Sequence, residues 1–162
     1  FWLKPSPHAA LPIGQIRIMS SNKQQVPQTV ANGKYQTAKR LGAGCFGEVH
    51  RGFNTEDKTE VAIKFEEVTA QAPPQLQHEA DILARLSAEG VQGIARFFHS
   101  GREERFNFMV FELLGHSLED RVQKCDQQKL TPQSTVLIAE QVLSRIEYLH
   151  SKCLVHRDIK PE

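Results

Sequence analysis

Cysteine is scarce in this chain, and its few copies are not arranged for a disulfide framework or a zinc site. The 162 residues contain three cysteines, Cys45, Cys125 and Cys153, with no C-x-x-C spacing. Disulfide scaffolds and zinc sites use paired, regularly spaced cysteines. We therefore expect a reducing, intracellular compartment, cytoplasmic or nuclear, and we assign no metal ligand within the chain.

Long apolar runs and an excess of one charge are also missing. No segment approaches the roughly 18 apolar residues that a membrane-spanning helix needs. The formal net charge is only +1, so no overall field favours nucleic acid or an anionic membrane. We therefore expect no nucleic-acid partner and no membrane association. Composition is otherwise that of an ordinary globular chain and identifies no function.

The first 33 residues carry prolines and polar side chains without a period of 2 or 3.6, which predicts a disordered N-terminal extension over residues 1–33. The chain opens with Phe1, while Met19 leads into the patterned region. A start at Met19 is therefore an alternative to a longer extension.

From Tyr35 onward, short strand signals alternate with turns and are interrupted by one helix. The helix follows two prolines and carries apolar residues at helical spacing. Its stripe is Leu76, Ala80, Leu83 and Leu86. The expected strands are residues 35–41, 49–53, 61–65, 94–99 and 106–111. Residues 34–115 are thus predicted to form one antiparallel sheet with one packed helix.

After Gly115 the pattern becomes helical. A capping box from Ser117 to Asp120 predicts a short helix, and Thr131 followed by Pro132 predicts the start of a longer one. The apolar stripe of the longer helix is Ala139, Val142, Leu143, Ile146 and Leu149. Residues 116–162 therefore begin a helical lobe, and the fold class is α+β.

A glycine loop lies between the first two expected strands. Gly42, Gly44, Gly47 and Val49 form G-x-G-x-x-G-x-V, and glycines let a backbone approach phosphate oxygens closely. The motif alone is weak, since chance produces it in roughly one chain of this length in twenty. A dinucleotide-binding loop would lead into a helix, whereas a strand is expected here, which disfavours a Rossmann oxidoreductase.

A lysine and a glutamate follow the loop in an informative order. Lys64 shares a strand face with Ala62, and a strand lysine is usually a solvated surface residue. Glu79 falls on the inward stripe of the helix, where an unpaired carboxylate is costly, unless it reaches water at the edge of the stripe. We predict that Lys64 pairs with Glu79 and holds the α- and β-phosphates of a nucleotide.

The sequence His156-Arg157-Asp158-Ile159-Lys160-Pro161 follows the long helix. Phosphoryl transfer needs a carboxylate that accepts and orients the attacking hydroxyl and a cation that offsets charge on the moving group. Asp158 and Lys160 can project to the same side and serve these two roles. Read alone, His-Arg-Asp is a polar surface turn; the order of glycine loop, Lys64, Glu79 and this loop argues against that interpretation.

This order of motifs resembles the protein kinase superfamily over residues 35–162. Lys160, two residues after Asp158, fits serine/threonine kinases. Four stretches resemble the casein kinase I family: residues 61–66, 74–76, 112–120 and 144–152. The resemblance implies a protein kinase-like fold, with a five-stranded antiparallel N-lobe carrying one helix and the first helices of an incomplete C-lobe.

The resemblance also implies cofactors, partners and further site residues. ATP and Mg²⁺ are the implied cofactors, and the partners are protein substrates, acidic or already phosphorylated, met by a monomer. Val49 and Ala62 enclose adenine, Phe111 is the gatekeeper, and Glu112 and Leu114 offer hinge backbone groups. The full implied nucleotide-binding set is Leu41, Gly42, Gly44, Gly47, Val49, Ala62, Lys64, Phe111, Glu112 and Leu114.

The chain departs from the family pattern at several positions. Cys45 replaces a usual Ser, His116 replaces a frequent Pro, and Phe111 replaces a common Met, which narrows the pocket behind adenine. The 162 residues also end before the Asn and Asp-Phe-Gly that bind magnesium in kinases. We expect those ligands beyond Glu162 and an inactive isolated fragment. The alternative is a noncatalytic kinase-like module that binds nucleotide or a partner. The presence of Lys64, Glu79 and Asp158 argues against it, because such a module has no chemical need for all three.

Overall fold

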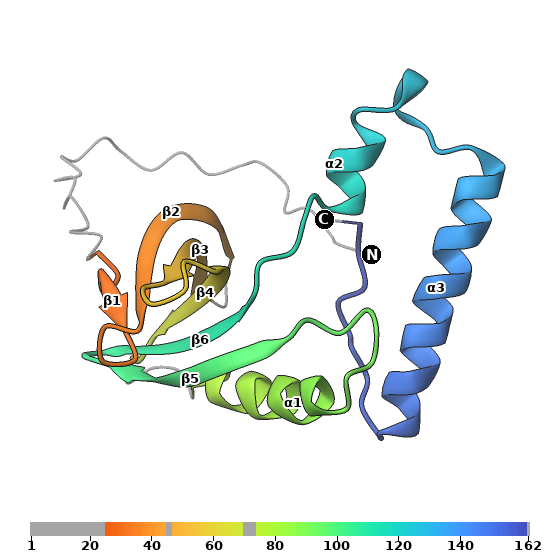
Figure 1. Ribbon diagram of the computed structural model, residues 1–162. Coiled ribbons are helices and arrows are strands. Elements are labelled where there is room, and N and C mark those ends of the chain that lie inside the picture. Colours follow the sequence, from red (N-terminus) through yellow and green to blue (C-terminus); the bar gives the residue numbers. More distant parts are fainter. Residues whose placement is uncertain (1–24, 45–46, 70–73, 162) are drawn as a thin grey trace, which may run out of the picture.

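The computed structural model describes residues 25–44, 47–69 and 74–161. An antiparallel sheet of six strands carries one helix, and two further helices lie beyond it (Figure 1). Along the sheet the strand order is β1-β2-β3-β4-β6-β5. The strands are β1 Thr29–Val30, β2 Tyr35–Gly44, β3 Gly47–Asn54, β4 Glu60–Glu67, β5 Phe97–Glu103 and β6 Phe106–Glu112. The helices are α1 Leu76–Ala88, α2 Leu118–Val122 and α3 Pro132–Ser151, with a 3₁₀ turn η1 at Asp126–Gln128.

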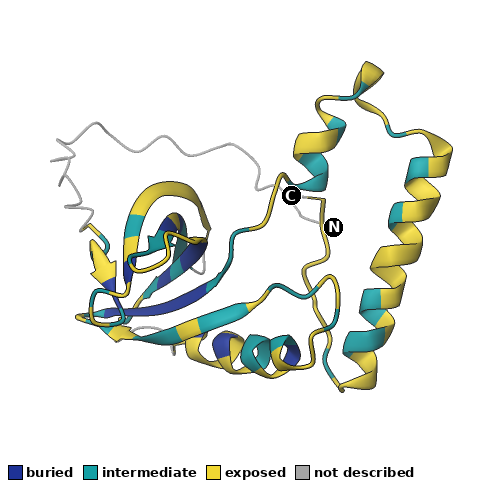
Figure 2. Ribbon diagram, viewed as in Figure 1, coloured by how far each residue is buried: buried dark blue, intermediate teal, exposed yellow. Residues whose placement is uncertain are grey.

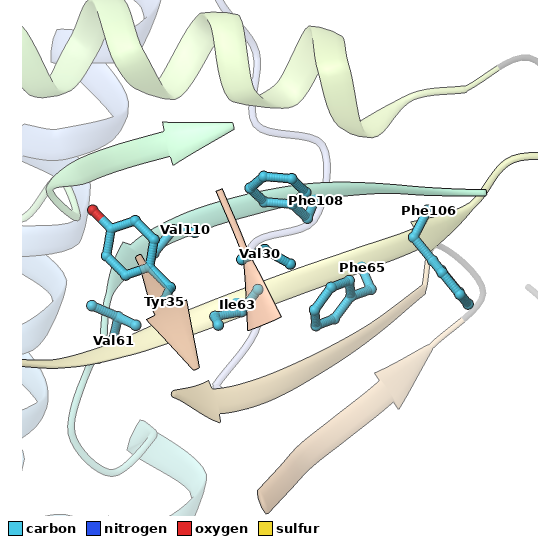
Figure 3. Close-up of a cluster of buried hydrophobic side chains, with 8 residues drawn as sticks. All are labelled: Val30, Tyr35, Val61, Ile63, Phe65, Phe106, Phe108 and Val110. Carbon is cyan, nitrogen blue, oxygen red and sulfur yellow. The ribbon is translucent and has the colours of Figure 1, made fainter. Parts of the chain in front are cut away.

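One face of the sheet carries the main hydrophobic core (Figure 3). Alternate residues of a strand point to the same face, and directly opposed residues of antiparallel neighbours share that face. Ile63 of β4 therefore lies beside Val110 of β6, and Phe65 lies beside Phe108. The eight buried side chains of this cluster are Val30, Tyr35, Val61, Ile63, Phe65, Phe106, Phe108 and Val110.

Strand β1 corrects part of the expected N-terminal extension. Thr29 pairs with Gln36 and Val30 with Tyr35, so the sheet has six strands rather than five. Val30 is fully buried in the core. The burial of this one valine orders residues that the sequence predicted to be disordered, because a two-residue strand is too short to show a period. Residues 1–24, including Met19, lie outside the described residues.

Strand β5 begins at Phe97, three residues later than expected. Residues before it form a turn in which the N–H of Ile94 donates to the carbonyl of Val91 at 3.3 Å, and Gly93 has a φ of +88°. The N–H of Phe97 then donates to the hydroxyl of Ser87 at 2.9 Å. Because of the turn and this contact with the end of α1, β5 begins at a later residue than expected.

Helix α1 covers the opposite face of the sheet from the main core. It buries Leu76, Ala80 and Leu86, and the first two pack against Met109 of β6. Met109 alternates with Phe108 and Val110, so its side chain emerges on the other face. This packing confirms the expected helix and places α1 against β5 and β6. Strand β6 and its neighbour β4 carry several candidate site residues.

Helices α2 and α3 begin where the sequence predicts. The Ser117 hydroxyl accepts the N–H of Asp120 and the Asp120 carboxylate accepts the N–H of Ser117, each at 3.0 Å, forming the expected capping box. The Thr131 hydroxyl accepts the N–H of Ser134 at 3.1 Å, with Pro132 in the first turn. Helix α3 has no buried residue (Figure 2). In its apolar stripe Ala139, Val142 and Leu143 are exposed, while Ile146 and Leu149 are partly buried.

Candidate active site

The central contact of the site joins β4 to α1. The Nζ of Lys64 donates to both carboxylate oxygens of Glu79, at 2.6 Å to Oε2 and 2.9 Å to Oε1. Charge-assisted hydrogen bonds of this length are about twice as strong as neutral ones. The lysine side chain is 18% exposed and the glutamate side chain 48%. The structure thus holds an ammonium group in place on the sheet face, with its carboxylate accessible to solvent.

We expected Glu79 to pair with Lys64 because its carboxylate would be buried, and the exposure of Glu79 shows that this reason is wrong. The inward stripe of α1 consists of Leu76, Ala80 and Leu86, and Glu79 lies at the edge of that stripe rather than within it. Water can solvate a half-exposed carboxylate, so no large desolvation cost forces the contact. The expected Lys64–Glu79 pair is present. The position of α1 on the sheet brings the two side chains together, and burial of the Glu79 carboxylate is not the cause.

The sheet register gathers several predicted nucleotide-binding residues on the face that carries Lys64. Val49 of β3 lies directly opposite Lys64, and Phe111 of β6 lies directly opposite Ala62. Directly opposed residues share a face, and Ala62 and Lys64 are two residues apart on one strand. Val49, Ala62, Lys64 and Phe111 therefore line a single face, the one opposite the main core.

The glycine turn links β2 to β3 beside this face. A Cβ on Gly42 or Gly44 would meet no atom within 4 Å, whereas a Cβ on Gly47 would lie 2.0 Å from the carbonyl oxygen of Phe65. Gly47 also has a φ of +116°, a conformation that side chains disfavour. Only Gly47 is thus demanded by packing, while Gly42 and Gly44 leave open space of the kind that a close-approaching ligand needs.

One residue of the implied nucleotide-binding set, Leu41, lies beside the glycines of β2 with its side chain half exposed. Leu41 is 50% exposed and lies where the β2–β3 register shifts, between Arg40 and Gly42. Cys45 lies outside the described residues. The structure therefore places Leu41 directly before Gly42, the first glycine of the motif.

The end of β6 and the residues after it carry the expected hinge groups. Phe111 packs partly buried against the cluster formed by α1 and Met109. The backbone N–H of Glu112 donates to the carbonyl of Arg96 at 2.8 Å, and its carboxylate accepts the N–H of Arg96 at 3.0 Å. Leu114 is 62% exposed. The N–H of Glu112 is therefore engaged in a backbone hydrogen bond to Arg96.

The loop after α3 brings Asp158 and Lys160 together. The Nζ of Lys160 lies 3.4 Å from Oδ2 of Asp158, and the two side chains are 53% and 72% exposed respectively. The N–H of Glu119 donates to the carbonyl of Pro161 at 2.8 Å, which ties the loop to the start of α2.

The site therefore consists of two separate pairs. Within residues 25–44, 47–69 and 74–161, no hydrogen bond or ion pair joins Asp158 to Lys64 or Glu79. The structure brings Lys64 to Glu79 and Asp158 to Lys160, and it does not link one pair to the other.

Sequence reasoning missed one residue beside this site. Glu66 lies two residues after Lys64 on β4, and its carboxylate accepts backbone N–H groups from Gln75 and Leu76 at the start of α1. Its position on the same strand face as Lys64 was a usable signal. Glu66 is nine residues from Gln75 and ten from Leu76 in the sequence, so no strand or helix periodicity predicts the contact.

Other features of the described chain do not contribute to this site. No group of three His, Cys, Asp or Glu side chains that could hold a metal ion occurs among the described residues. A cavity of about 340 Å³ lies between residues 25–28 and strands β2 and β3, lined by Thr37, Glu48 and His50 among others. Glu48 and His50 alternate with Val49, so this cavity opens on the other face of the sheet. No helix in the described part is long and apolar enough to cross a membrane.

Comparison with known protein families places most of this chain within one of them. A family model described as the protein kinase domain matches residues 35–162. The match begins at the first residue of β2 and contains the glycine turn, the Lys64–Glu79 pair and the Asp158 loop. Every residue assigned to the candidate site lies within it.

Proposed function

This chain belongs to the protein kinase family, and from that membership we propose that it is an ATP-dependent serine/threonine kinase of the casein kinase I type. The observation that carries the proposal is the bidentate contact of Lys64 with Glu79, on the sheet face that also bears Val49 and Ala62. The serine/threonine assignment is supported by Lys160, two residues after Asp158. The casein kinase I assignment is supported by residues 112–120, within which Ser117 and Asp120 form the capping box of α2.

ATP binding uses the face of the sheet opposite the main core. Adenine lies between Val49 and Ala62, with Phe111 behind it, and the glycine turn approaches the phosphates through Gly42 and Gly44. Lys64 binds the α- and β-phosphates while Glu79 holds its ammonium in place. The pair suits this role because the lysine is largely shielded from water, which strengthens its attraction for phosphate.

Phosphoryl transfer takes place at the loop that carries Asp158. The hydroxyl oxygen of a substrate serine or threonine forms a bond to the γ-phosphorus, and the bond from that phosphorus to the β–γ bridging oxygen breaks, releasing ADP. Asp158 accepts the hydroxyl proton, and Lys160 offsets charge on the transferred group. Both side chains are more than half exposed, so a protein substrate can reach them.

Magnesium is the usual companion of ATP in protein kinases, where it neutralises phosphate charge. We assign it to no residue of this chain, because the ligands expected from the kinase resemblance are an Asn directly after the catalytic loop and the Asp of an Asp-Phe-Gly sequence. No Asp-Phe-Gly sequence occurs in the 162 residues. We therefore propose that these residues alone do not transfer phosphate.

The substrates proposed are proteins with acidic or already phosphorylated sites. The enzyme is proposed to act as a monomer in an intracellular compartment, cytoplasmic or nuclear. A peptide pair identical except for a phosphoserine before the acceptor serine tests the substrate proposal. Equal kcat/KM for the two peptides would contradict phosphate priming.

Transfer of radiolabelled phosphate from γ-labelled ATP to casein tests the proposed function. The assay uses the chain extended past Glu162 along its own reading frame, beside the Asp158→Asn variant of the same form. We expect incorporation to fall by several orders of magnitude in the variant, because the hydroxyl loses its proton acceptor. Equal incorporation by both forms would favour the noncatalytic nucleotide- or partner-binding module instead.

A further inference from the structure

The N-terminus of α1 has no cap of its own. The first N–H groups of any helix lack intrahelical acceptors and need partners from elsewhere. Gln75, at the N-cap position, makes no side-chain capping hydrogen bond. A residue from outside the helix supplies the acceptors instead.

Glu66 of β4 provides these acceptors. Its Oε1 accepts the N–H of Gln75 at 2.8 Å. Its two oxygens share the N–H of Leu76, each at 3.2 Å. A carboxylate at a helix N-terminus is stabilised both by these hydrogen bonds and by the positive end of the helix dipole. Glu66 thus caps α1 from the sheet.

The Glu66 carboxylate is itself held in position. Asn107 lies directly opposite it on β6, is 8% exposed, and donates from Nδ2 to Oε2 of Glu66 at 3.1 Å. A buried amide therefore orients the carboxylate toward the helix. Glu66 is fixed from the sheet side and from the helix side at once.

Two contacts from one strand face now join β4 to α1. Lys64 and Glu66 are two residues apart, so both point toward the helix. Glu79 lies one turn into α1, with its N–H donating to the carbonyl of Gln75 at 3.1 Å. The carboxylate of Glu66 fixes the start of the helix, and the start of the helix determines where Glu79 lies relative to Lys64.

We propose that Glu66 is a positioning residue, which caps α1 from β4 so that Glu79 reaches Lys64. The proposal rests on the proposed function of Lys64 as the phosphate anchor. Glu66 touches no nucleotide in this scheme and acts through the helix alone. Without it, α1 keeps its apolar contacts but loses the restraint that aligns its first turns with the strand.

Amide hydrogen exchange in the nucleotide-free chain tests the restraint directly. We expect Glu66→Ala to speed exchange at Gln75 and Leu76 about five- to tenfold, the effect of losing a helix cap with charged hydrogen bonds. Glu66→Gln keeps one acceptor oxygen and should show a smaller increase. The matched control is Glu67→Gln, the next carboxylate on β4, whose side chain pairs with Arg105 at 3.4 Å and makes no hydrogen bond to the described residues of α1. Equal exchange in wild type and both Glu66 variants would overturn the proposal.

A double-mutant cycle on ATP affinity separates positioning from general stability. We expect Glu66→Ala to weaken ATP binding about fivefold when Glu79 is present and to have no further effect in a Glu79→Gln background. The same loss in both backgrounds would overturn the positioning role. If Glu66→Ala does not fold, Glu66→Gln takes its place in the cycle. If the wild-type chain binds no ATP, the proposed function is wrong. The exchange experiment still shows whether Glu66 holds the start of α1 in place.

Discussion

At residue 64 the chain places a shielded ammonium between two carboxylate oxygens, and this contact has a measurable consequence. Replacing Glu79 by Gln removes the countercharge but keeps a hydrogen-bond acceptor. We expect Glu79→Gln to weaken ATP binding about tenfold, which corresponds to the loss of one charge-assisted contact. Isothermal titration calorimetry with ATP measures this change.

A control for this prediction lies on the same strand. Glu60, at the start of β4, pairs with Arg51 of β3 and lies away from α1. Glu60→Gln makes the same change of charge without touching the Lys64 contact. A comparable loss of ATP affinity in Glu60→Gln would show that net charge, and not the Lys64–Glu79 contact, sets the affinity.

Gly47 provides a prediction about stability. An alanine there would hold a φ of +116° and place its Cβ 2.0 Å from the Phe65 carbonyl oxygen. Strained backbone and forced movement of packed atoms each cost about 1–3 kcal/mol. We expect Gly47→Ala to lower the free energy of unfolding by about 3 kcal/mol, measured by urea denaturation. Gly42→Ala, whose Cβ meets open space, should leave stability nearly unchanged, and a loss as large as that of Gly47→Ala would contradict the geometric explanation.

Single residues show how far the sequence alone could be taken at the site. Lys64 and Glu79 were paired correctly because the order of motifs and the strand alternation both pointed to them. The burial assigned to Glu79 was wrong, since a stripe in sequence does not say how closely the sheet covers the edge of a helix. Glu66 was missed because its contact with Gln75 depends on the path of the intervening chain.

Among the elements, α1 is held at its far end as well as at its start. Glu89, directly after α1, accepts a hydrogen bond from Lys152 Nζ at 2.7 Å and one from the Tyr148 hydroxyl at 3.0 Å. Arg145 of α3 donates from Nη1 to the carbonyl of Gln92 at 2.7 Å. These polar contacts tie α1 to the end of α3, just before the Asp158 loop.

The pH dependence of this tie follows from its pKa shifts. The hydrogen bond from Lys152, followed by that from Tyr148, lowers the pKa of Glu89 from its ordinary value of 4.5. The hydrogen bond to Glu89 raises the pKa of Lys152 from 10.5. A lowered acid pKa contributes stability that is present above 4.5 and lost as pH falls through the folded value. A raised lysine pKa contributes stability that is present below 10.5 and lost as pH rises through the folded value.

We therefore expect the tie to strengthen the end of α3 between pH 4.5 and 10.5 and to weaken outside that window. Protection factors of the amides in residues 148–152 should be lower in Glu89→Gln than in wild type at neutral pH. The difference should shrink progressively below pH 4.5. Glu140→Gln on α3 serves as the control, because Glu140 makes no ion pair with the described residues. A difference that persists unchanged in acid would contradict the ionic explanation.

The elements differ in how well local sequence predicts them. Helices α2 and α3 were predicted to their first residues because Ser117, Asp120, Thr131 and Pro132 are local stop-and-start signals that act within four residues. Strand β1 was missed because Val30 is ordered by the core it enters rather than by its neighbours in sequence. Short elements of this kind depend on tertiary contacts, which a pattern of alternation does not contain.

Across the whole molecule, burial is divided unequally (Figure 2). Within the part of the chain that the structure describes, the thirteen buried hydrophobic residues all belong to the sheet region and α1. Helix α3, by contrast, has no buried residue, and Leu137 and Leu143 are 57% and 64% exposed. A helix gains most of its stability from packing an apolar face. The chain taken alone is therefore a well-packed sheet lobe joined to a helix with little tertiary support.

This division predicts two different stabilities within one chain. Amides of β4 and β6 should exchange only on global unfolding, whereas those in the middle of α3 should exchange through local opening at a lower free energy. Ile63→Ala, at a fully buried position, should lower the free energy of unfolding of the sheet by about 2–5 kcal/mol. Leu143→Ala should change it by less than about 0.5 kcal/mol, as exposed positions usually do. Uniform exchange across β4, β6 and α3, or a Leu143→Ala effect as large as that of Ile63→Ala, would mean that α3 is packed against a surface within this chain. In that case the exposed stripe of α3 could not be an apolar face without a partner among the described residues.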